Sequence, residues 1–143
     1  MVQDIETAIE IAAPADRVWS VLTHAADVEK WLGSLRYQPA LGHVFYMQQD
    51  NARRARGDIE GAIHCQVETL DRRRRFGFSW YVPDMPKTHV EITLKPSDVG
   101  TRVSLTHTGW NEYPPEQSQP IREGLAKGWS QFVLPMLKKV AEG

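Results

Sequence analysis

The stretch VEITLKPSDVGTRVSLTHTGW, residues 90–110, decides the fold because it pairs with itself in one register. A four-residue turn over residues 97–100 sets Pro96 opposite Thr101. Counting back from that pair places these side chains opposite one another: Leu94 and Val103, Ile92 and Leu105, and Val90 and His107. A slip of one residue would move one apolar set to the other face of the sheet. The stretch therefore predicts an antiparallel hairpin whose apolar inner face ends in a histidine.

The same alternation extends upstream and predicts further strands from about residue 43. The apolar residues of each segment are in phase, namely Phe45 and Met47, then Ile59, Ile63, Cys65 and Val67, then Phe76, Phe78 and Trp80. A turn over residues 71–74 sets Val67 opposite Phe78 and Cys65 opposite Trp80. Residues 5–11 alternate in the same way near the N-terminus, so we expect six strands in all.

Two short helices are predicted directly after the first strand, in the stretch AAPADRVWSVLTHAADVEKWLG, residues 12–33. Pro14 suits a first helical turn, and Asp16 lies where the helix dipole favours an acidic side chain. Gly33 can end the second helix, which runs from about Asp27 to Leu32, with a positive φ.

A long helix is predicted at the end of the chain, from about residue 115 or 120 to residue 141. Its apolar stripe consists of Ile121, Leu125, Trp129, Phe132, Met136 and Val140, with Val133 and Leu137 beside it. Pro135 removes one backbone donor, so we expect the helix to bend near Gln131. Gly124 and Gly128 lie on or beside the stripe, where they favour either a close approach of the helix to the sheet or room for a ligand.

These elements predict an α+β fold and a single domain over residues 1–143. A curved, six-stranded antiparallel sheet wraps around the long C-terminal helix, and the two short helices close part of the rim. That helix is the only predicted element large enough to cover the apolar face of the sheet. We expect a small-molecule cavity in the space between sheet and helix.

Composition excludes several classes of function. The formal net charge of −1 gives no global reason to expect nucleic acid or acidic membranes as partners. Cys65 is the only cysteine, so no internal disulfide can form. The N-terminal residues do not form a signal peptide, and no apolar run approaches the roughly 20 residues of a membrane span. We expect a cytoplasmic monomer or homodimer.

The chain also lacks the patterns of common cofactor sites. No spacing of His, Cys, Asp or Glu suits zinc, and no glycine loop suits a phosphate. His64 and Cys65 are adjacent in a strand and point to opposite faces, which excludes a shared site. The sequence predicts neither a metal nor a cofactor.

Several motifs resemble the START-like helix-grip superfamily, also called SRPBCC. Residues 9–32, IEIAAPADRVWSVLTHAADVEKWL, are similar to its opening, and RRRRFGFSW at residues 72–80 is similar to its strand ending in Phe-x-Phe-x-Trp. Residues 90–110 resemble its hairpin, and GLAKGWSQFVLPMLKKV at residues 124–140 resembles its terminal helix. The closest branch looks like the homologues of the C-terminal domain of the activator of the ninety-kilodalton heat-shock protein's ATPase.

This resemblance implies a helix-grip fold with a cavity for lipids, sterols, polyketides or other apolar ligands. The superfamily also includes cyclases and hydrolases that use the same cavity. The full-length ATPase activator, a co-chaperone, has a separate N-terminal chaperone-binding domain, for which we expect 143 residues to leave no room. The fold and the cavity therefore transfer more directly than ATPase activation does.

The predicted binding site is the inward surface of the sheet and helix. It comprises Trp31, Phe45, Met47, Ile63, Cys65, Phe78, Trp80, Val90, Leu105, His107, Trp110, Gly128, Trp129 and Phe132. Aromatic walls supply a large apolar area, and methionine makes such walls adaptable. Plain core packing is the competing interpretation for each of these residues.

His107 has three interpretations. It can be a core histidine, satisfied by a backbone carbonyl or by Trp110. It can be a polar group of the cavity that orients a ligand. It can also be a general acid or base, which would need a partner from the rim loops such as Asp84, Glu112 or Tyr113.

Three functions follow from these interpretations. The first is a non-enzymatic protein that binds a small apolar or amphipathic molecule. The second is a hydrolase or cyclase with His107 as its acid–base group. The third is an interaction module for a chaperone or another protein. Two arginine-rich runs, residues 53–56 and 72–75, suit an acidic partner, and the sequence leaves open whether they lie at the same end of the sheet.

Overall fold

The sheet is one antiparallel meander closed by the N-terminal strand. The computed structural model describes residues 4–143, without the side chain of Pro115. Its strands follow the order β1-β7-β6-β5-β4-β3-β2. Their bounds are Ile5–Ile11 for β1, Ser34–Leu35 for β2, Val44–Met47 for β3, Ile63–Asp71 for β4, Arg75–Tyr81 for β5, Thr88–Pro96 for β6 and Thr101–Thr108 for β7. The sheet has seven strands where six were predicted, because the two-residue β2 is too short to show an alternation.

The hairpin of β6 and β7 has the predicted register. Pro96 pairs with Thr101 and Val90 pairs with His107. The predicted pairs of β4 and β5, Cys65 with Trp80 and Val67 with Phe78, are also present.

Nearer the turn, a β-bulge between Val67 and Thr69 adds one residue to β4, so Asp71 pairs with Arg75. The turn therefore has three residues between its strands, not four. Ile59 also lies outside the strand where it was expected, because β4 begins only at Ile63.

Helices flank the sheet as predicted, with two additions. The two short helices are α1, Ala15–Thr23, and α2, Ala25–Leu32. Gly33 ends α2 with a φ of 72°, the left-handed conformation that the sequence predicts there. The unpredicted elements are α3, Asn51–Ala55, and the 3-10 turn η1, Trp110–Glu112.

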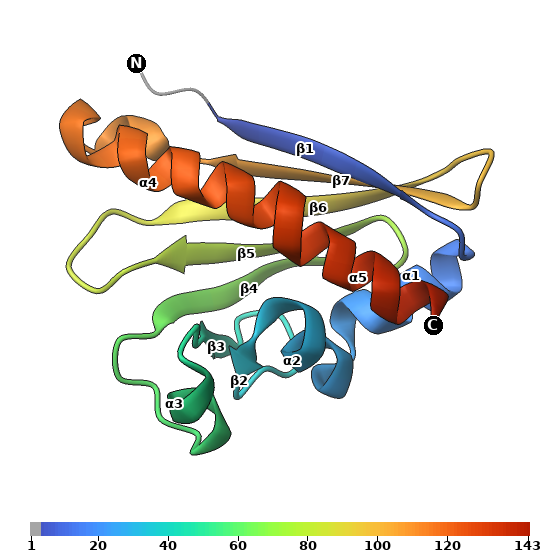
Figure 1. Ribbon diagram of the computed structural model, residues 1–143, viewed down its shortest axis with the longest axis horizontal. Coiled ribbons are helices and arrows are strands. Elements are labelled where there is room, and N and C mark those ends of the chain that lie inside the picture. The colour runs from blue at the N-terminus through green and yellow to red at the C-terminus, as the bar shows by residue number, and fades with distance from the viewer. Residues whose placement is uncertain (1–3) are drawn as a thin grey trace.

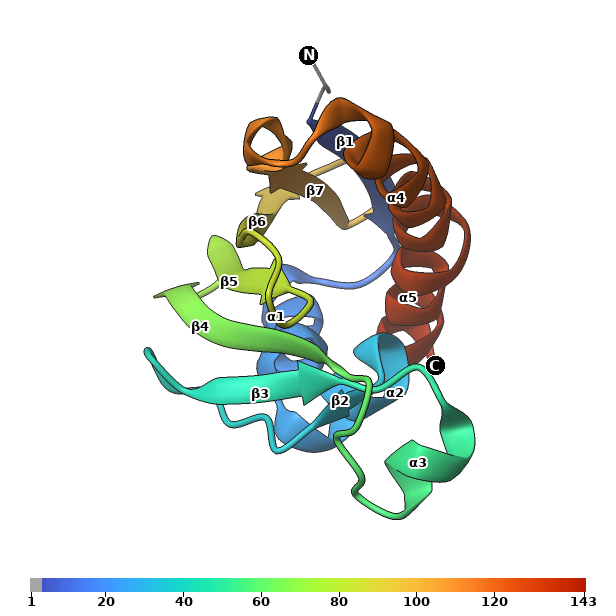
Figure 2. The ribbon, with the colours of Figure 1, turned by 90° about the vertical axis from the view of Figure 1, so that its left-hand side faces the viewer.

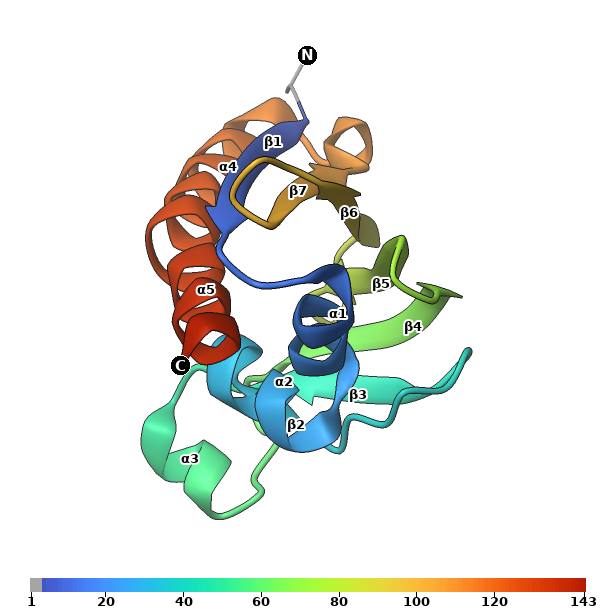
Figure 3. The same cartoon turned by 90° about the vertical axis from the view of Figure 1, so that its right-hand side faces the viewer.

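The C-terminal helix consists of α4, Pro115–Gly128, the π-helical turn η2, Trp129–Val133, and α5, Leu134–Glu142. It runs along the concave side of the sheet (Figure 1). Figure 2 and Figure 3 show from both ends how the sheet curves from β1, beside the C-terminal helix, round to β3 and β2, where α2 lies near α5. This is the helix-grip arrangement that the sequence predicts.

The π turn lies where Pro135 predicted an irregularity. The backbone N–H of Leu134 bonds to the carbonyl of Trp129, five residues back. A π turn holds one residue more than an α turn, so the positions that face inward after it lie one residue later in the sequence. Leu137 and Ala141 are buried in place of Met136 and Val140. Phe132 is 70% exposed, so its predicted place on the inward face of the helix is wrong.

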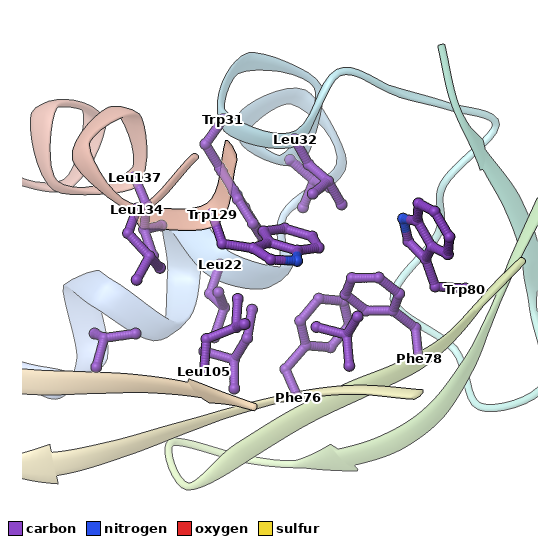
Figure 4. Packing of buried hydrophobic residues seen from close by; sticks show 14 of the residues in the cluster. Leu22, Trp31, Leu32, Phe76, Phe78, Trp80, Leu105, Trp129, Leu134 and Leu137 are labelled. Atoms are coloured by element: carbon purple, nitrogen blue, oxygen red, sulfur yellow. The ribbon is translucent and has the colours of Figure 1, made fainter. Parts of the chain in front are cut away.

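Side chains fill most of the interior between the sheet and the helices. Figure 4 shows Trp129 reaching from the C-terminal helix toward Phe76 and Phe78 of β5, with Leu22 of α1 and Leu32 of α2 around them. A continuous apolar cluster of buried residues joins all of these elements. The space predicted as one cavity is therefore largely a packed core.

Candidate functional site

His107 is the penultimate residue of β7 and is completely buried. Its Nδ1 accepts a hydrogen bond of 3.1 Å from Trp129 Nε1. An indole N–H can only donate, so the imidazole proton is on Nε2. Nε2 donates to Thr88 Oγ1 at 2.6 Å, and the Thr88 hydroxyl donates to the carbonyl of Trp80 at 2.7 Å. This chain of bonds fixes both the tautomer and the orientation of the ring.

The surroundings of His107 keep it neutral. Burial lowers the pKa of this imidazole from 6.5 to about 3, with a smaller contribution from the charge of His89. The rings of Trp80, Trp110 and Trp129 lie around it, with centroids 5.3, 4.7 and 6.0 Å away. Both ring nitrogens form hydrogen bonds within the protein, so the structure supports the interpretation of His107 as a core histidine. The geometry does not suit a general acid or base.

The rim residues proposed as catalytic partners do not complete a site. Tyr113 is buried, and its hydroxyl donates to the carbonyl of Pro86 at 2.8 Å. Asp84 and Glu112 are exposed. None of the three forms a hydrogen bond with His107 in the part of the chain that the structure describes.

An apolar pocket of about 160 Å³ opens between the C-terminal helix and the adjacent ends of β3 and β4. Its lining residues are Met47, Gln49, Ile63, Leu125, Gly128, Trp129 and Val133. Met47 and Ile63 are register partners at the last pair of β3 and β4, so their side chains meet the helix together. The pocket is mainly hydrophobic, with the Gln49 amide at its exposed rim.

Gly128 contributes empty space to this pocket. A Cβ atom built at Gly128 or at Gly124 would meet no atom within 4 Å. The interpretation of these glycines as a close approach of helix to sheet is therefore wrong. Gly128 lines the pocket, whereas Gly124 is exposed and does not.

The predicted site residues fall into three groups. Met47, Ile63, Gly128 and Trp129 line the pocket. Phe132 lies on the surface. The others are buried in the core, and these are Trp31, Phe45, Cys65, Phe78, Trp80, Val90, Leu105, His107 and Trp110.

Two of the buried predictions have clear structural roles. The indole of Trp31 donates to the carbonyl of Val21 at 3.0 Å and ties α2 to α1. Burial raises the pKa of the Cys65 thiol well above its usual value, so this sulfur stays protonated and unreactive.

Gln49, Leu125 and Val133 also line the pocket but were not among the predicted site residues. Leu125 lies on the predicted stripe, one helical turn before Trp129, and Val133 lies beside that stripe, so both had a signal in the sequence. The π turn then brings Val133 to the pocket.

The two arginine-rich runs lie at opposite ends of the sheet (Figure 1). Residues 72–74 form the turn between β4 and β5, and Arg75 begins β5; Arg73 of this turn pairs with Asp16 of α1 at 3.0 Å. Residues 53–56 lie at α3, where Arg54 donates to the carbonyl of Gln48 at 2.8 Å. The runs do not combine into one basic surface.

Over residues 4–143, no three His, Cys, Asp or Glu side chains gather closely enough to hold a metal ion. In the same range, no helix has the length and hydropathy that crossing a membrane requires.

The curved antiparallel sheet, the C-terminal helix across it and the apolar pocket at their edge define a helix-grip protein. The chain belongs to the family described as activator of Hsp90 ATPase homolog 1-like proteins, whose model matches residues 12–142. This match confirms the resemblance noted in the sequence. None of the curated proteins compared with the chain matches it.

Solved structures of known proteins share the fold. Protein MLL2253 from Mesorhizobium loti has a TM-score of 0.79 at 24% identity, with 96% of each chain covered. The Aha1 dimer from Colwellia psychrerythraea has a TM-score of 0.67 at 18% identity, covering 99% of this chain and 97% of that one. DynU16, from the dynemicin biosynthetic locus, has a TM-score of 0.74 at 18% identity, covering 97% of this chain and 47% of that one.

Proposed function

We propose that this protein binds a small apolar or amphipathic molecule in the pocket between the C-terminal helix and the ends of β3 and β4. The observation that carries the proposal is the open space at Gly128. Glycine in a helix interior costs about 1 kcal/mol relative to alanine. Gly128 has an ordinary helical φ of −59°, and no neighbouring atom requires its lack of a side chain. The lack of a side chain at Gly128 therefore leaves space in the pocket.

The size of the pocket suits one ring or a short alkyl chain. Apolar cavities of roughly 150 Å³ in other proteins bind a molecule as large as benzene, and the space here is about 160 Å³. Met47 can change its rotamer to admit a larger group. A longer ligand would place one end in the pocket and extend past Gln49 at the rim.

The comparisons support a small-molecule role at the level of the fold. DynU16, which has this fold, comes from the dynemicin biosynthetic locus. The hydrogen bonds of His107 argue for binding rather than for turnover, because neither ring nitrogen is free to exchange a proton with a ligand.

A thermal-shift screen against lipids, sterols, polyphenols and acyl compounds tests the proposal. A ligand at 100 times its dissociation constant adds about 2.7 kcal/mol of stability and should raise the melting temperature by several degrees. We expect Gly128→Leu to fill the pocket and abolish the shift. Gly124→Leu is the matched control, because it adds the same side chain to an exposed position of the same helix.

Two results would overturn the proposal. One is the absence of a saturable shift for every class of compound in a protein that melts cooperatively. The other is a shift that Gly128→Leu and Gly124→Leu retain equally, because binding would then occur elsewhere on the molecule.

A further inference from the structure

The indole N–H of Trp80 is a buried donor without an acceptor. Trp80 is 3% exposed, and its Nε1 has no hydrogen-bond partner among the described residues. The corresponding groups of Trp31, Trp110 and Trp129 each have one. Burying a donor without a partner is unfavourable, and native proteins rarely do it. The exception at Trp80 therefore calls for an explanation.

Trp80 does not itself line the pocket, but it is connected to two residues that do, Ile63 and Trp129. It pairs with Cys65 across β4 and β5, and Ile63, a pocket residue, is two positions from Cys65 on the same face of β4. Ile63 and Trp80 are therefore diagonal neighbours across β4 and β5, and such neighbours are within reach of an aromatic side chain. Trp129 forms another wall of the pocket and bonds to His107, whose ring lies 5.3 Å from that of Trp80.

The nitrogen of Trp80 faces inward. In Figure 4, it lies on the side of the ring directed toward Trp129 and Leu32, away from the strand that carries it. An acceptor that entered past Ile63 and Trp129 would therefore approach the N–H side of the indole.

The charge of the surroundings decides which acceptor fits. A buried carboxylate needs a cation or several donors to offset its lost hydration. Two ionisable groups lie next to Trp80: His107, which is neutral with both nitrogens engaged, and Cys65, whose thiol is protonated. One neutral N–H can satisfy one uncharged oxygen.

We propose that Trp80 Nε1–H donates a hydrogen bond to an uncharged oxygen of the ligand, so that the site selects apolar molecules bearing a ketone, aldehyde or ester carbonyl over the matching carboxylates. This inference rests on the proposed function and names the class of its ligand. The apolar part occupies the pocket, and the carbonyl oxygen reaches inward to the indole.

Nitrogen-15 NMR of the full chain tests the proposal through the indole N–H signals, assigned with single Trp→Phe variants. Three compounds with the same six-membered ring serve as probes: cyclohexyl methyl ketone, ethylcyclohexane and cyclohexanecarboxylate. They are aliphatic, so they add no ring current of their own. We expect the ketone to move the Trp80 proton downfield saturably, as formation of a hydrogen bond does. Ethylcyclohexane should bind without that shift.

Affinities provide the second readout. One net hydrogen bond corresponds to a roughly threefold to tenfold preference for the ketone over the hydrocarbon, and the carboxylate should bind more weakly than both. Trp80→Phe should remove the preference for the ketone and leave hydrocarbon binding in place. The wild-type spectra stand on their own if this variant does not fold.

The outcomes separate this inference from the proposed function. If ketone and hydrocarbon bind equally and the Trp80 signal does not move, the inference is wrong and the pocket remains a binding site. Tighter binding of the carboxylate would also overturn it. If none of the three probes binds and the screen of larger compounds is also negative, the proposed function fails as well.

Discussion

His107 of β7 connects three other elements through hydrogen bonds. Its ring joins Trp129 of the C-terminal helix to Thr88 of β6, and through Thr88 to the backbone of β5. A neutral imidazole offers one donor and one acceptor in fixed directions, which is what this position uses. An apolar side chain here would leave Trp129 Nε1 without its acceptor. His107 therefore explains why an apolar strand face ends in a polar residue.

The buried state of His107 predicts a pH dependence of stability. The folded state keeps the ring neutral down to a pKa of about 3, whereas the unfolded chain binds a proton near pH 6.5. Between these values the unfolded state holds more protons, so the free energy of unfolding falls as the pH falls. From pH 7 to pH 5 we expect this residue to cost roughly 2 kcal/mol.

Urea unfolding of the wild type and of His107→Gln at both pH values measures this contribution. The variant keeps one donor and one acceptor but does not titrate, so its stability should depend less on pH. A carbon-13 NMR titration of the His107 ring in the wild type is an independent check. A titration midpoint near 6.5 in the folded protein would contradict the prediction.

At the scale of the element, the π turn decides which face of the C-terminal helix is buried. Upstream of the turn, Leu125 and Trp129 face inward as predicted, whereas Ile121 of the predicted stripe is exposed. Downstream of it, each inward position follows one residue later than a regular helix would place it. The same turn brings Val133 to the pocket beside Trp129.

Adjacent alanine substitutions test the direction of this shift. Met136 is 40% exposed and Leu137 is completely buried. Leu137→Ala should cost about 2–5 kcal/mol of stability, as large-to-small changes in a core do. Met136→Ala should change it by about 0.5 kcal/mol, as is usual for a surface position. Denaturant unfolding measures both values, and the reverse order would mean that the helix continues without the π turn.

At the scale of the whole molecule, polar contacts hold the end of the C-terminal helix against the N-terminal part of the chain. The Glu142 carboxylate accepts from the backbone N–H of Ala12 at 2.7 Å and pairs with Lys138. Lys138 also donates to the carbonyl of Glu10 at 2.9 Å. These bonds connect residues about as far apart in sequence as the chain allows, so they form only in the complete fold.

Removing the charge of Glu142 should weaken the contact between the end of the C-terminal helix and the N-terminal part of the chain. Hydrogen bonds from Lys138 and then from Ala12 hold the pKa of the Glu142 carboxyl below its usual value. Its stabilising effect is therefore present at neutral pH and is lost as the pH falls through the lowered pKa. We expect Glu142→Gln to melt at a lower temperature than the wild type at pH 7, and the difference to disappear in acid.

Thermal melts over a series of pH values check this expectation. Glu29→Gln is the matched control, because Glu29 is exposed on α2 and has no ion pair in the described part of the chain. A difference for Glu142→Gln that persists unchanged at low pH would show that the charge is not the cause.

The sequence by itself determined the register of the hairpin of β6 and β7, the two short helices, the long C-terminal helix and the family to which the chain belongs. These features depend on local periods and on turns of fixed length, such as the one that sets Val90 opposite His107. It also placed Met47, Ile63, Gly128 and Trp129 in the candidate site, because they share the inward face.

Only the tertiary structure decided which inward residues border empty space and which are packed. Phe45 and Ile63 project from the same face of neighbouring strands, yet only Ile63 borders the pocket. The difference arises from what lies opposite each side chain: Leu125, Gly128, Trp129 and Val133 of the C-terminal helix border the same space as Ile63, whereas Phe45 is completely buried. A local pattern can report which face a side chain takes, but not what the opposing element places against it.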